Sequence, residues 1–238
     1  MKLSIVVPVY NEAKTVSQIL KKVAEVNLER WQKEIIIVDD GSQDTTASEV
    51  KKILPYLKKR AERVEFIIRS NNGGKGAAVK DGLKKVTGDA VLTQDGDLEY
   101  DPFEWPALLD ELERSKATIV LGYRKIDFFR PGYFFIALGV KVSTILLNLL
   151  YRCQISDIYS CYKLTRVKDL KTINYYSNGF ELDIEIVCKL LKNGFKAVEV
   201  PISYIPRSRE EGKKITIKHG LVGLWTIIKV SLFYYSQK

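Results

Sequence analysis

Strand-like and helix-like segments alternate through the first half of the chain. Short runs of branched apolar residues, such as 3–9 and 34–39, are each followed by a longer amphipathic stretch, such as 13–26. This alternation predicts an α/β fold with a mostly parallel central sheet flanked by helices, because parallel strands need long, usually helical, connections. The other segments of the pattern are strand-like at 64–69, 90–93 and 117–121 and helix-like at 45–59 and 75–86.

The chain has 238 residues, enough for one sizeable domain with its own core. No internal repeat, low-complexity tract or linker divides it, so we expect residues 1–238 to form a single domain. The three cysteines show no C-x-x-C spacing, which argues against a zinc site or a disulfide framework and favours a reducing, cytoplasmic setting. The apolar run at the N-terminus is too short for a secretion signal.

A net charge of +9 indicates anionic partners, which could be nucleotide phosphates, nucleic acid or an inner membrane surface. The lysines are spread over helix faces and no RNA-binding signature is present, so a nucleic-acid-binding protein is the remote alternative. The single histidine, His219, leaves little room for mechanisms with a histidine base or a histidine metal cluster. We expect it to have an ordinary surface or interfacial role.

Polar loops follow the predicted strands at the point where each strand ends. Ligands of such sheets bind beyond the carboxyl ends of the strands, so these loops should gather on one rim. They contain Asn11 and the segments 39–42, 71–76 and 95–99.

The segment TQDGDLEYDP carries Asp95 and Asp97 two residues apart, with Gly96 between them. Alternate residues of an extended backbone point the same way, so the two carboxylates can converge on one ion. Oxygen ligands of this kind suit Mg²⁺ or Mn²⁺, with substrate phosphates completing the shell. An acidic surface turn is the common alternative for an isolated D-x-D pattern.

Three further loops have features that suit a nucleotide. In PVYNE, Tyr10 can offer its ring to a base and Glu12 can accept a hydrogen bond, and Asp39 and Asp40 in VDDGSQD can accept from a base or ribose. The loop NNGGKGAAV is similar to a phosphate cradle at a helix start. It lacks the P-loop pattern, and Val79 stands where a dinucleotide fingerprint has its third glycine, so nicotinamide and flavin enzymes are disfavoured.

Two apolar, aromatic segments, 128–151 and 221–235, are candidates for contact with a membrane. Interrupting charges and Pro131 favour an interfacial or partly buried helix over a span for the first segment. We expect an amphipathic helix at 217–238, where aromatic residues and scattered lysines suit a membrane interface. Simple packing of both helices on the sheet is the alternative.

Seven motifs occur in order: PVYNE, VDDGSQD, GGKGAA, QDGDLEYDP, LGYR, SDIYSCYKL and VPISYIPRSREEGKKI. This set resembles the family 2 glycosyltransferases with the GT-A nucleotide-sugar fold, in the branch of dolichol-phosphate mannose synthase and related polyprenyl-phosphate glycosyltransferases. The resemblance covers nearly the whole chain. It implies an inverting, metal-dependent transfer of mannose or glucose from a GDP- or UDP-sugar to a polyprenyl phosphate such as dolichyl phosphate. It also implies a peripheral protein on the cytoplasmic face of a membrane.

The resemblance implies roles on the donor side of the site. Asp95, Asp97, Arg124 and Asp157 would be the catalytic residues, and Asp95, Asp97 and Glu99 would bind Mg²⁺ or Mn²⁺. The residues implied for nucleotide binding are Pro8, Tyr10, Glu12, Asp39, Asp40, Lys75, Asp95, Gly96 and Asp97.

On the acceptor side, Arg124 would meet the donor phosphates or the acceptor, and Asp157 and Ser160 would line the sugar pocket. Some relatives carry C-terminal membrane spans, so a separate membrane-anchoring partner is possible for this chain. The residues implied for the acceptor phosphate are Arg130, Arg207, Arg209, Lys213 and Lys214.

Departures from the family pattern leave the exact sugar open. Gly96 replaces the more usual alanine, which should be tolerated, and Cys161 stands where many synthases have glycine. No Q-x-x-R-W motif is present, which argues against a processive synthase. A sugar hydroxyl is the alternative acceptor; it would need a base to remove its proton, and Asp157 is the one candidate.

Overall fold

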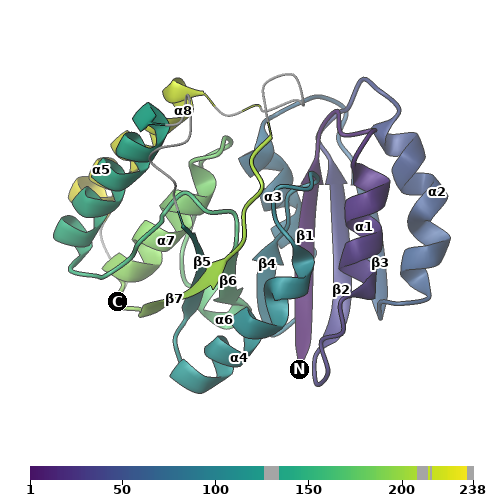
Figure 1. The fold of residues 1–238 in the computed structure, drawn as a ribbon, viewed down its shortest axis with the longest axis horizontal. Helices are drawn as coiled ribbons and strands as arrows, with labels where there is room; N and C mark the ends of the chain where they lie inside the picture. Colours follow the sequence, from purple (N-terminus) through teal and green to yellow (C-terminus); the bar gives the residue numbers. More distant parts are fainter. Residues whose placement is uncertain (126–133, 208–213, 215, 235–238) are drawn as a thin grey trace.

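The computed structural model describes residues 1–125, 134–207, 214 and 216–234, and these residues form a central seven-stranded sheet in the order β3-β2-β1-β4-β6-β5-β7 (Figure 1). The sheet is mostly parallel, as the sequence predicts. The strands are β1 Lys2–Val9, β2 Gln32–Asp39, β3 Arg63–Ile68, β4 Ala90–Thr93, β5 Ile119–Arg124, β6 Lys163–Arg166 and β7 Ala197–Ile202, and the helices are α1 Val16–Glu25, α2 Thr46–Lys58, α3 Lys75–Leu83, η1 Pro102–Glu104, α4 Trp105–Ser115, α5 Phe134–Tyr151, α6 Val167–Leu170, α7 Leu182–Lys192 and α8 Ile217–Phe233.

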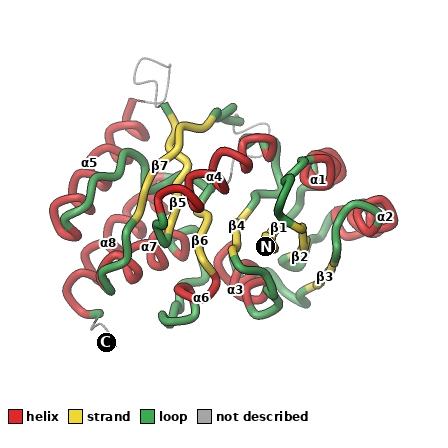
Figure 2. The backbone as a smooth tube through the Cα atoms, turned by 90° about the horizontal axis from the view of Figure 1, so that it is seen from below, coloured by secondary structure: helices red, strands yellow, loops and turns green. Residues whose placement is uncertain are grey.

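The half of the sheet built from β1 to β4 is entirely parallel, and its strands β1, β2 and β4 are largely buried. β1 pairs with β2 and β4, and β2 pairs with β3, each in parallel register. Leu3, Ile5 and Val7 of β1 belong to the core cluster that also contains residues of α1, α2 and α4, while Val6 belongs to the cluster beneath α3. Burial on both faces explains the apolar runs of β1, β2 and β4. The edge strand β3 is only partly buried. Figure 2 shows the two helical layers.

The other half of the sheet contains an antiparallel strand that the sequence pattern does not predict. β6 lies between β4 and β5 and runs antiparallel to both, and β5 pairs in parallel with β7. β6 has only four residues, KLTR, which form no apolar run. Because β6 is reversed, the segment before it reaches the same rim as the segments after β1, β4 and β7.

Helices α5 and α8 lie side by side at one end of the molecule (Figure 1). The hydroxyl of Tyr159 joins them, because it lies 3.2 Å from the Ser143 hydroxyl of α5 and donates to the Gly220 carbonyl of α8 at 3.0 Å. His219 stabilises the start of α8, where its Nδ1 accepts from the Thr216 N–H in a capping box. The single histidine therefore has a structural role, as expected.

Both helices keep large apolar side chains in contact with solvent. Within the described residues, no helix combines the length and apolar character needed to cross a bilayer. The predicted helix at 217–238 is confirmed over Ile217–Phe233, whereas residues 128–133 and 235–238 of the two apolar segments lie outside the described residues. The exposed apolar side chains are Ile136, Leu138, Val142, Ile145, Leu149 and Leu150 on α5 and Ile217, Leu221, Val222, Trp225, Leu232 and Phe233 on α8.

Candidate active site

The rim at the carboxyl ends of the strands carries a cluster of buried acidic side chains. Glu12 follows β1, and Asp95, Asp97 and Glu99 follow β4. Glu12, Asp97 and Glu99 are each at most 9% exposed. Unpaired carboxylates are costly to bury, so this cluster needs positive charge nearby.

Arg207, which follows β7, supplies that charge. Its Nη1 lies 3.1 Å from Glu12 Oε2, its Nη2 lies 2.5 Å from Asp97 Oδ2, and its Nε lies 3.6 Å from Glu99 Oε1. The Arg207 N–H donates to Glu99 Oε1 at 2.8 Å, and the Tyr204 hydroxyl donates to Glu99 Oε2 at 3.0 Å. One guanidinium thus bridges two loops that are far apart in the sequence.

Lys214 adds a second cation at the edge of the cluster. Its Nζ donates to Glu12 Oε1 at 2.8 Å and to the Tyr10 carbonyl, and it lies 5.5 Å from the Tyr10 ring centroid. Arg207 and Lys214, which the resemblance assigns to the acceptor phosphate, here contact residues assigned to the donor. The other residues assigned to the acceptor phosphate, Arg130, Arg209 and Lys213, lie outside the described residues.

Asp95 has a separate partner on the other side. Lys75 Nζ, at the start of α3, lies 2.7 Å from Asp95 Oδ1 and 3.4 Å from Asp183 Oδ2 of α7. Burial alone would raise the pKa of Asp95, but the Lys75 ammonium lowers it below its usual value. Burial, and next the Asp95 charge, raise the pKa of Asp97 to about 7 despite Arg207. The two carboxylates of the D-x-D motif therefore have opposite shifts.

The chemistry of this donor set fits a hard divalent cation, because all of its side chains offer carboxylate oxygens. As the described residues are placed, however, no three His, Cys, Asp or Glu side chains converge closely enough to hold a metal ion. Glu12, Asp97 and Glu99 converge on the Arg207 guanidinium instead. The cluster is thus a cation-binding site whose cation comes from the protein itself.

The glycine-rich loop makes hydrogen bonds within the protein. The N–H groups of Gly73 and Gly74 donate to the Asp40 carboxylate at 3.0 and 2.8 Å, and the Ala77 N–H donates to the Asn178 carbonyl at 3.0 Å. Arg69 also pairs with Asp40. Three N–H groups of this loop thus bind the protein's own oxygens, and the role of the loop as a phosphate cradle stays a prediction.

Asp39 differs from Asp40 in having an unused oxygen. Its Oδ1 accepts from the Ser42 N–H at 2.9 Å, whereas its buried Oδ2 has no hydrogen-bond partner among the described residues. Buried polar atoms are normally paired, so a bound ligand is a reasonable source of the missing donor. Asp39 therefore stays a predicted nucleotide contact, while Asp40 organises the loop that carries Lys75.

Arg124 and Asp157 form a buried, two-point ion pair. Arg124 Nε lies 2.6 Å from Asp157 Oδ2, and Nη2 lies 3.0 Å from Oδ1. Asp157 is 0% exposed. The Arg124 guanidinium also lies over the Tyr204 ring, 4.8 Å from its centroid. Both oxygens of Asp157 are therefore engaged by Arg124, so neither is offered to an acceptor hydroxyl.

Ser160, the second residue of the predicted sugar pocket, has a buried Oγ with no hydrogen-bond partner among the described residues. Its carbonyl accepts from Lys163, a buried side chain whose pKa is lowered by burial. The unused hydroxyl is consistent with a ligand contact.

Pro8 and Gly96 lie in close contact where β1 meets the D-x-D loop. A Cβ at Gly96 would lie 2.8 Å from Val9 Cγ1 and 3.3 Å from the Pro8 carbonyl oxygen. The family's usual alanine would therefore require Val9 to move, so the expected tolerance of this position depends on that side chain.

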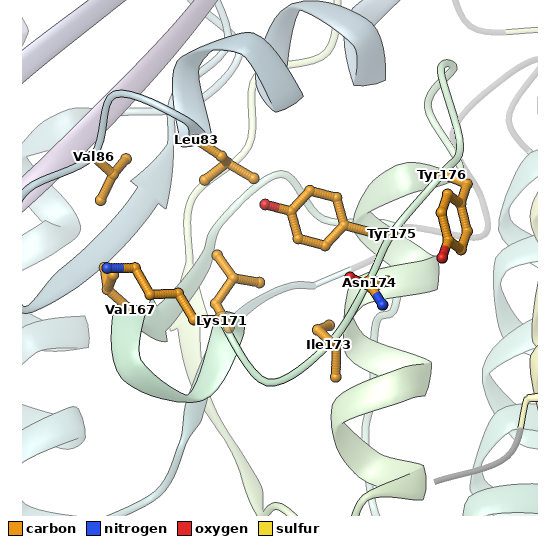
Figure 3. Close-up of a pocket in the computed structure, with 9 residues that line it drawn as sticks. Leu83, Val86, Val167, Lys171, Ile173, Asn174, Tyr175 and Tyr176 are labelled. Atoms are coloured by element: carbon orange, nitrogen blue, oxygen red, sulfur yellow. The ribbon is translucent and has the colours of Figure 1, made fainter. Parts of the chain in front are cut away.

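A hollow of about 300 Å³ lies apart from these residues, between the end of α3 and the segment around α6. Figure 3 shows Tyr175 extending into the space beside Leu83. None of the predicted site residues lines it. The acidic rim is therefore the better candidate for the chemistry.

Two contributors to the rim were missed by sequence reasoning. Asp183 has no motif around it, and it reaches Lys75 because the loop before α7 lies against α3, where the Asn178 carbonyl accepts from the Ala77 N–H. Tyr204 lies within the quoted motif VPISYIPRSREEGKKI, so the motif could have drawn attention to it.

Comparison with known proteins identifies the family of this chain. Residues 4–173 match the family described as Glycosyl transferase family 2. The chain belongs to this family. The family 2 prediction, and with it the prediction of a glycosyltransferase, is confirmed.

Curated family 2 relatives act on polyprenyl phosphates according to their names. The dodecaprenyl-phosphate galacturonate synthase of Rhizobium johnstonii is 29% identical over 176 residues, covering 73% of this chain and 50% of the relative. The dolichol-phosphate mannosyltransferase of Pyrococcus furiosus is 27% identical over 218 residues, covering 90% of this chain and 59% of the relative. The chain thus spans about half to three fifths of the length of these two relatives.

Solved structures confirm the GT-A fold of this family 2 chain. Glucosyl-3-phosphoglycerate synthase from Mycobacterium tuberculosis, in complex with Mn²⁺, uridine diphosphate and phosphoglyceric acid, gives a TM-score of 0.71 at 17% identity. The match covers 99% of this chain and 80% of that one. At this identity the likeness concerns the fold alone.

Proposed function

We propose that this chain is an inverting, metal-dependent hexosyltransferase that moves mannose or glucose from a GDP- or UDP-sugar to a polyprenyl phosphate. The observation that carries the choice of acceptor is the buried pair of Arg124 and Asp157. Asp157 is the base candidate that we name for a hydroxyl acceptor, and both of its oxygens are on Arg124. A phosphate acceptor fits such a site because it is already ionised near neutral pH, with a second pKa of about 6.

Names of the relatives support the same acceptor class. Dodecaprenyl phosphate and dolichol phosphate appear in the names of the Rhizobium and Pyrococcus proteins. They differ in the sugar, galacturonate in one and mannose in the other. The acceptor class is thus better supported than the identity of the sugar.

On the donor side, Asp95, Asp97 and Glu99 would hold Mg²⁺ or Mn²⁺, as the chemistry of their oxygens allows. When bound, the ion would neutralise charge on the departing nucleoside diphosphate. Complexes of the Mycobacterium synthase with Mn²⁺ or Mg²⁺ and uridine diphosphate support this assignment. Tyr10 and the unused oxygen of Asp39 would then contact the base or ribose.

On the acceptor side, Arg207 and Lys214 would hold the incoming phosphate, and the unused hydroxyl of Ser160 would contact the sugar. Catalysis would rest on positioning and charge rather than on proton transfer. Attack by the phosphate oxygen opposite the leaving group would invert the anomeric centre.

We further propose that α5 and α8 bind the cytoplasmic face of a membrane peripherally. Large apolar side chains on both helices are exposed, for example Leu149 at 72% and Ile217 at 71%. Exposed Lys141 and Lys229 accompany them and would favour anionic lipids. A separate membrane-anchoring partner would act in addition to this surface.

The test is an extraction assay with purified protein, Mg²⁺ or Mn²⁺, dolichyl or undecaprenyl phosphate, and a panel of labelled GDP- and UDP-sugars. We expect label in the organic phase that disappears with EDTA, and a product of inverted anomeric configuration by NMR. Label that enters a sugar hydroxyl acceptor but not the lipid would overturn the proposed acceptor. Absence of donor binding would overturn the proposed enzyme activity.

A further inference from the structure

We propose that Arg207 is an internal counter-cation: it neutralises the carboxylate cluster in the ligand-free protein and must leave before the cluster can hold a divalent cation. This inference rests on the proposed function, which assigns Asp97 to cation binding and Arg207 to the acceptor phosphate. It goes further because Arg207 cannot occupy the carboxylate cluster and bind the acceptor phosphate at the same time.

The contacts of Arg207 are those of a cation in a prepared site. Its guanidinium is 15% exposed and reaches carboxylates from the loops after β1 and β4, with 2.5 Å to Asp97 Oδ2 and 3.1 Å to Glu12 Oε2. The neighbouring backbone fixes this position, because the Ile205 N–H donates to the Glu99 carbonyl at 2.9 Å. Arg207 is thus held in the cluster by its side chain and by its segment.

Occupation by Arg207 blocks the oxygen that an ion would need. Asp97 Oδ1 accepts from the Glu99 N–H at 3.0 Å, which leaves Oδ2 as the oxygen that points to the cluster, and Arg207 Nη2 lies on it. A divalent cation bound to the same oxygen would sit beside a positive guanidinium with little solvent to screen the repulsion. Cation binding and the present position of Arg207 therefore exclude one another.

The exchange has a consequence for substrate order. While the donor site is empty, Arg207 is engaged with carboxylates and is not offered to a phosphate. Once the donor and its cation take over the charge of the cluster, the guanidinium is released close to the reacting centre. The acceptor phosphate would then meet its arginine only in the donor-loaded enzyme, which is a coupling between two sites through one residue.

Mn²⁺ binding without donor or lipid tests this inference directly. Electron paramagnetic resonance of free Mn²⁺ would be used to titrate the wild type and the Arg207→Gln variant. We expect Arg207→Gln to bind Mn²⁺ about tenfold or more tightly, in the usual range of coupling between sites. Arg207→Lys keeps the charge and should stay close to the wild type.

The matched control is Arg114→Gln, which removes an exposed arginine that pairs only with Glu111 among the described residues. It should leave Mn²⁺ affinity unchanged, so a general charge effect would be visible. Unchanged or weaker Mn²⁺ binding in Arg207→Gln would overturn the inference, as would absence of Mn²⁺ binding in both proteins. A purely structural role for Arg207 would lower affinity, the opposite of the expected change.

Failure of this inference is distinguishable from failure of the proposed function. Tighter Mn²⁺ binding in Arg207→Gln together with no label in lipid would support the counter-cation and reject the acceptor. Lipid labelling by the wild type together with unchanged Mn²⁺ affinity in Arg207→Gln would support the proposed acceptor and reject the counter-cation.

Discussion

The acidic rim and the α5–α8 surface depart from the usual arrangement of a globular protein in opposite directions. At the rim, charged side chains are buried, such as Asp97 at 8% and Asp157 at 0% exposed. On α5 and α8, large apolar side chains are exposed, such as Leu149 and Trp225. Each arrangement is unfavourable in water without a partner.

The difference lies in how each region is satisfied within the chain. The rim carries its own counter-charges, since Lys75, Arg124 and Arg207 pair with its carboxylates. The helices instead present their apolar side chains to solvent, which a lipid surface would cover. The rim is thus neutralised by internal ion pairs, whereas the helical surface would be covered only by a partner outside the described residues.

The largest effect is expected from removing the charge of Asp97, at the centre of the acidic rim. Asp97→Asn should lower turnover about 10³-fold, because it removes a charge that would help to stabilise the departing diphosphate. Initial rates of lipid labelling would measure it. Asp110→Asn, an exposed acidic residue on α4, is the control and should retain wild-type rates. Substantial turnover by Asp97→Asn would reject the role of Asp97.

Breaking the buried Arg124–Asp157 pair should cost stability. Asp157→Ala leaves the Arg124 guanidinium buried without its partner, and we expect a loss of about 3–5 kcal/mol in the free energy of unfolding. Urea denaturation would measure it. The double variant Arg124→Met with Asp157→Leu should recover much of the loss, because no uncompensated charge remains. Equal destabilisation in both variants would show that the pair itself is not the cause.

On the helical surface, the double change Leu221→Ser with Trp225→Ser should weaken vesicle binding. Each of these side chains would contribute about 1.5–3 kcal/mol if buried in lipid, so together a loss of about 100-fold is expected. Flotation with vesicles containing anionic lipid would measure it. Phe103→Ser, a half-exposed aromatic residue outside α5 and α8, is the control. Unchanged flotation of the double variant would remove α8 from the membrane contact.

The free energy of unfolding should depend on pH through Asp97. Because the pKa of Asp97 is raised to about 7 in the folded protein, its favourable contribution is complete below the unfolded-state value and is lost as pH rises through 7. Relative to Asp97→Asn, the wild type should therefore lose about 3–4 kcal/mol between pH 4 and pH 8, because this pKa lies about three pH units above its usual value and each unit corresponds to about 1.36 kcal/mol. Urea unfolding of both proteins at several pH values measures the difference. Parallel pH profiles would contradict the raised pKa.

The smallest expected effect concerns Gly96. Gly96→Ala should destabilise the protein by about 1 kcal/mol, because its Cβ would approach Val9 Cγ1 to 2.8 Å. A double-mutant cycle with Val9→Ala would test this, since the shortened side chain should remove most of the added cost. Additive effects in the cycle would place the strain elsewhere.

Sequence reasoning succeeded where local pattern determines structure. The strand-like runs of β1 to β4 are separated by helix-like stretches, and their parallel direction follows from these crossover connections. The D-x-D motif at the end of β4 likewise lies on the rim where the pattern predicts it. β6 escaped prediction because four residues with two charges carry no strand signal.

The arrangement of charges within the rim depends on contacts between distant segments. Arg207 and Asp97 are 110 residues apart, and Lys75 and Asp183 meet only because the segment before α7 folds against the start of α3. No local pattern reveals such pairs. Conversely, the glycine loop has the composition of an anion site, yet Asp40 is the anion that it binds.

The Tyr159 hydroxyl, which joins Ser143 of α5 to Gly220 of α8, belongs to the same short segment as Ser160 and Asp157. The backbone N–H of Tyr159 donates to Asp157 Oδ1 at 3.0 Å. Tyr159 therefore connects the packing of α5 and α8 to the segment that carries the predicted sugar-pocket residues, so that one short segment contacts both the apolar surface and the acidic rim.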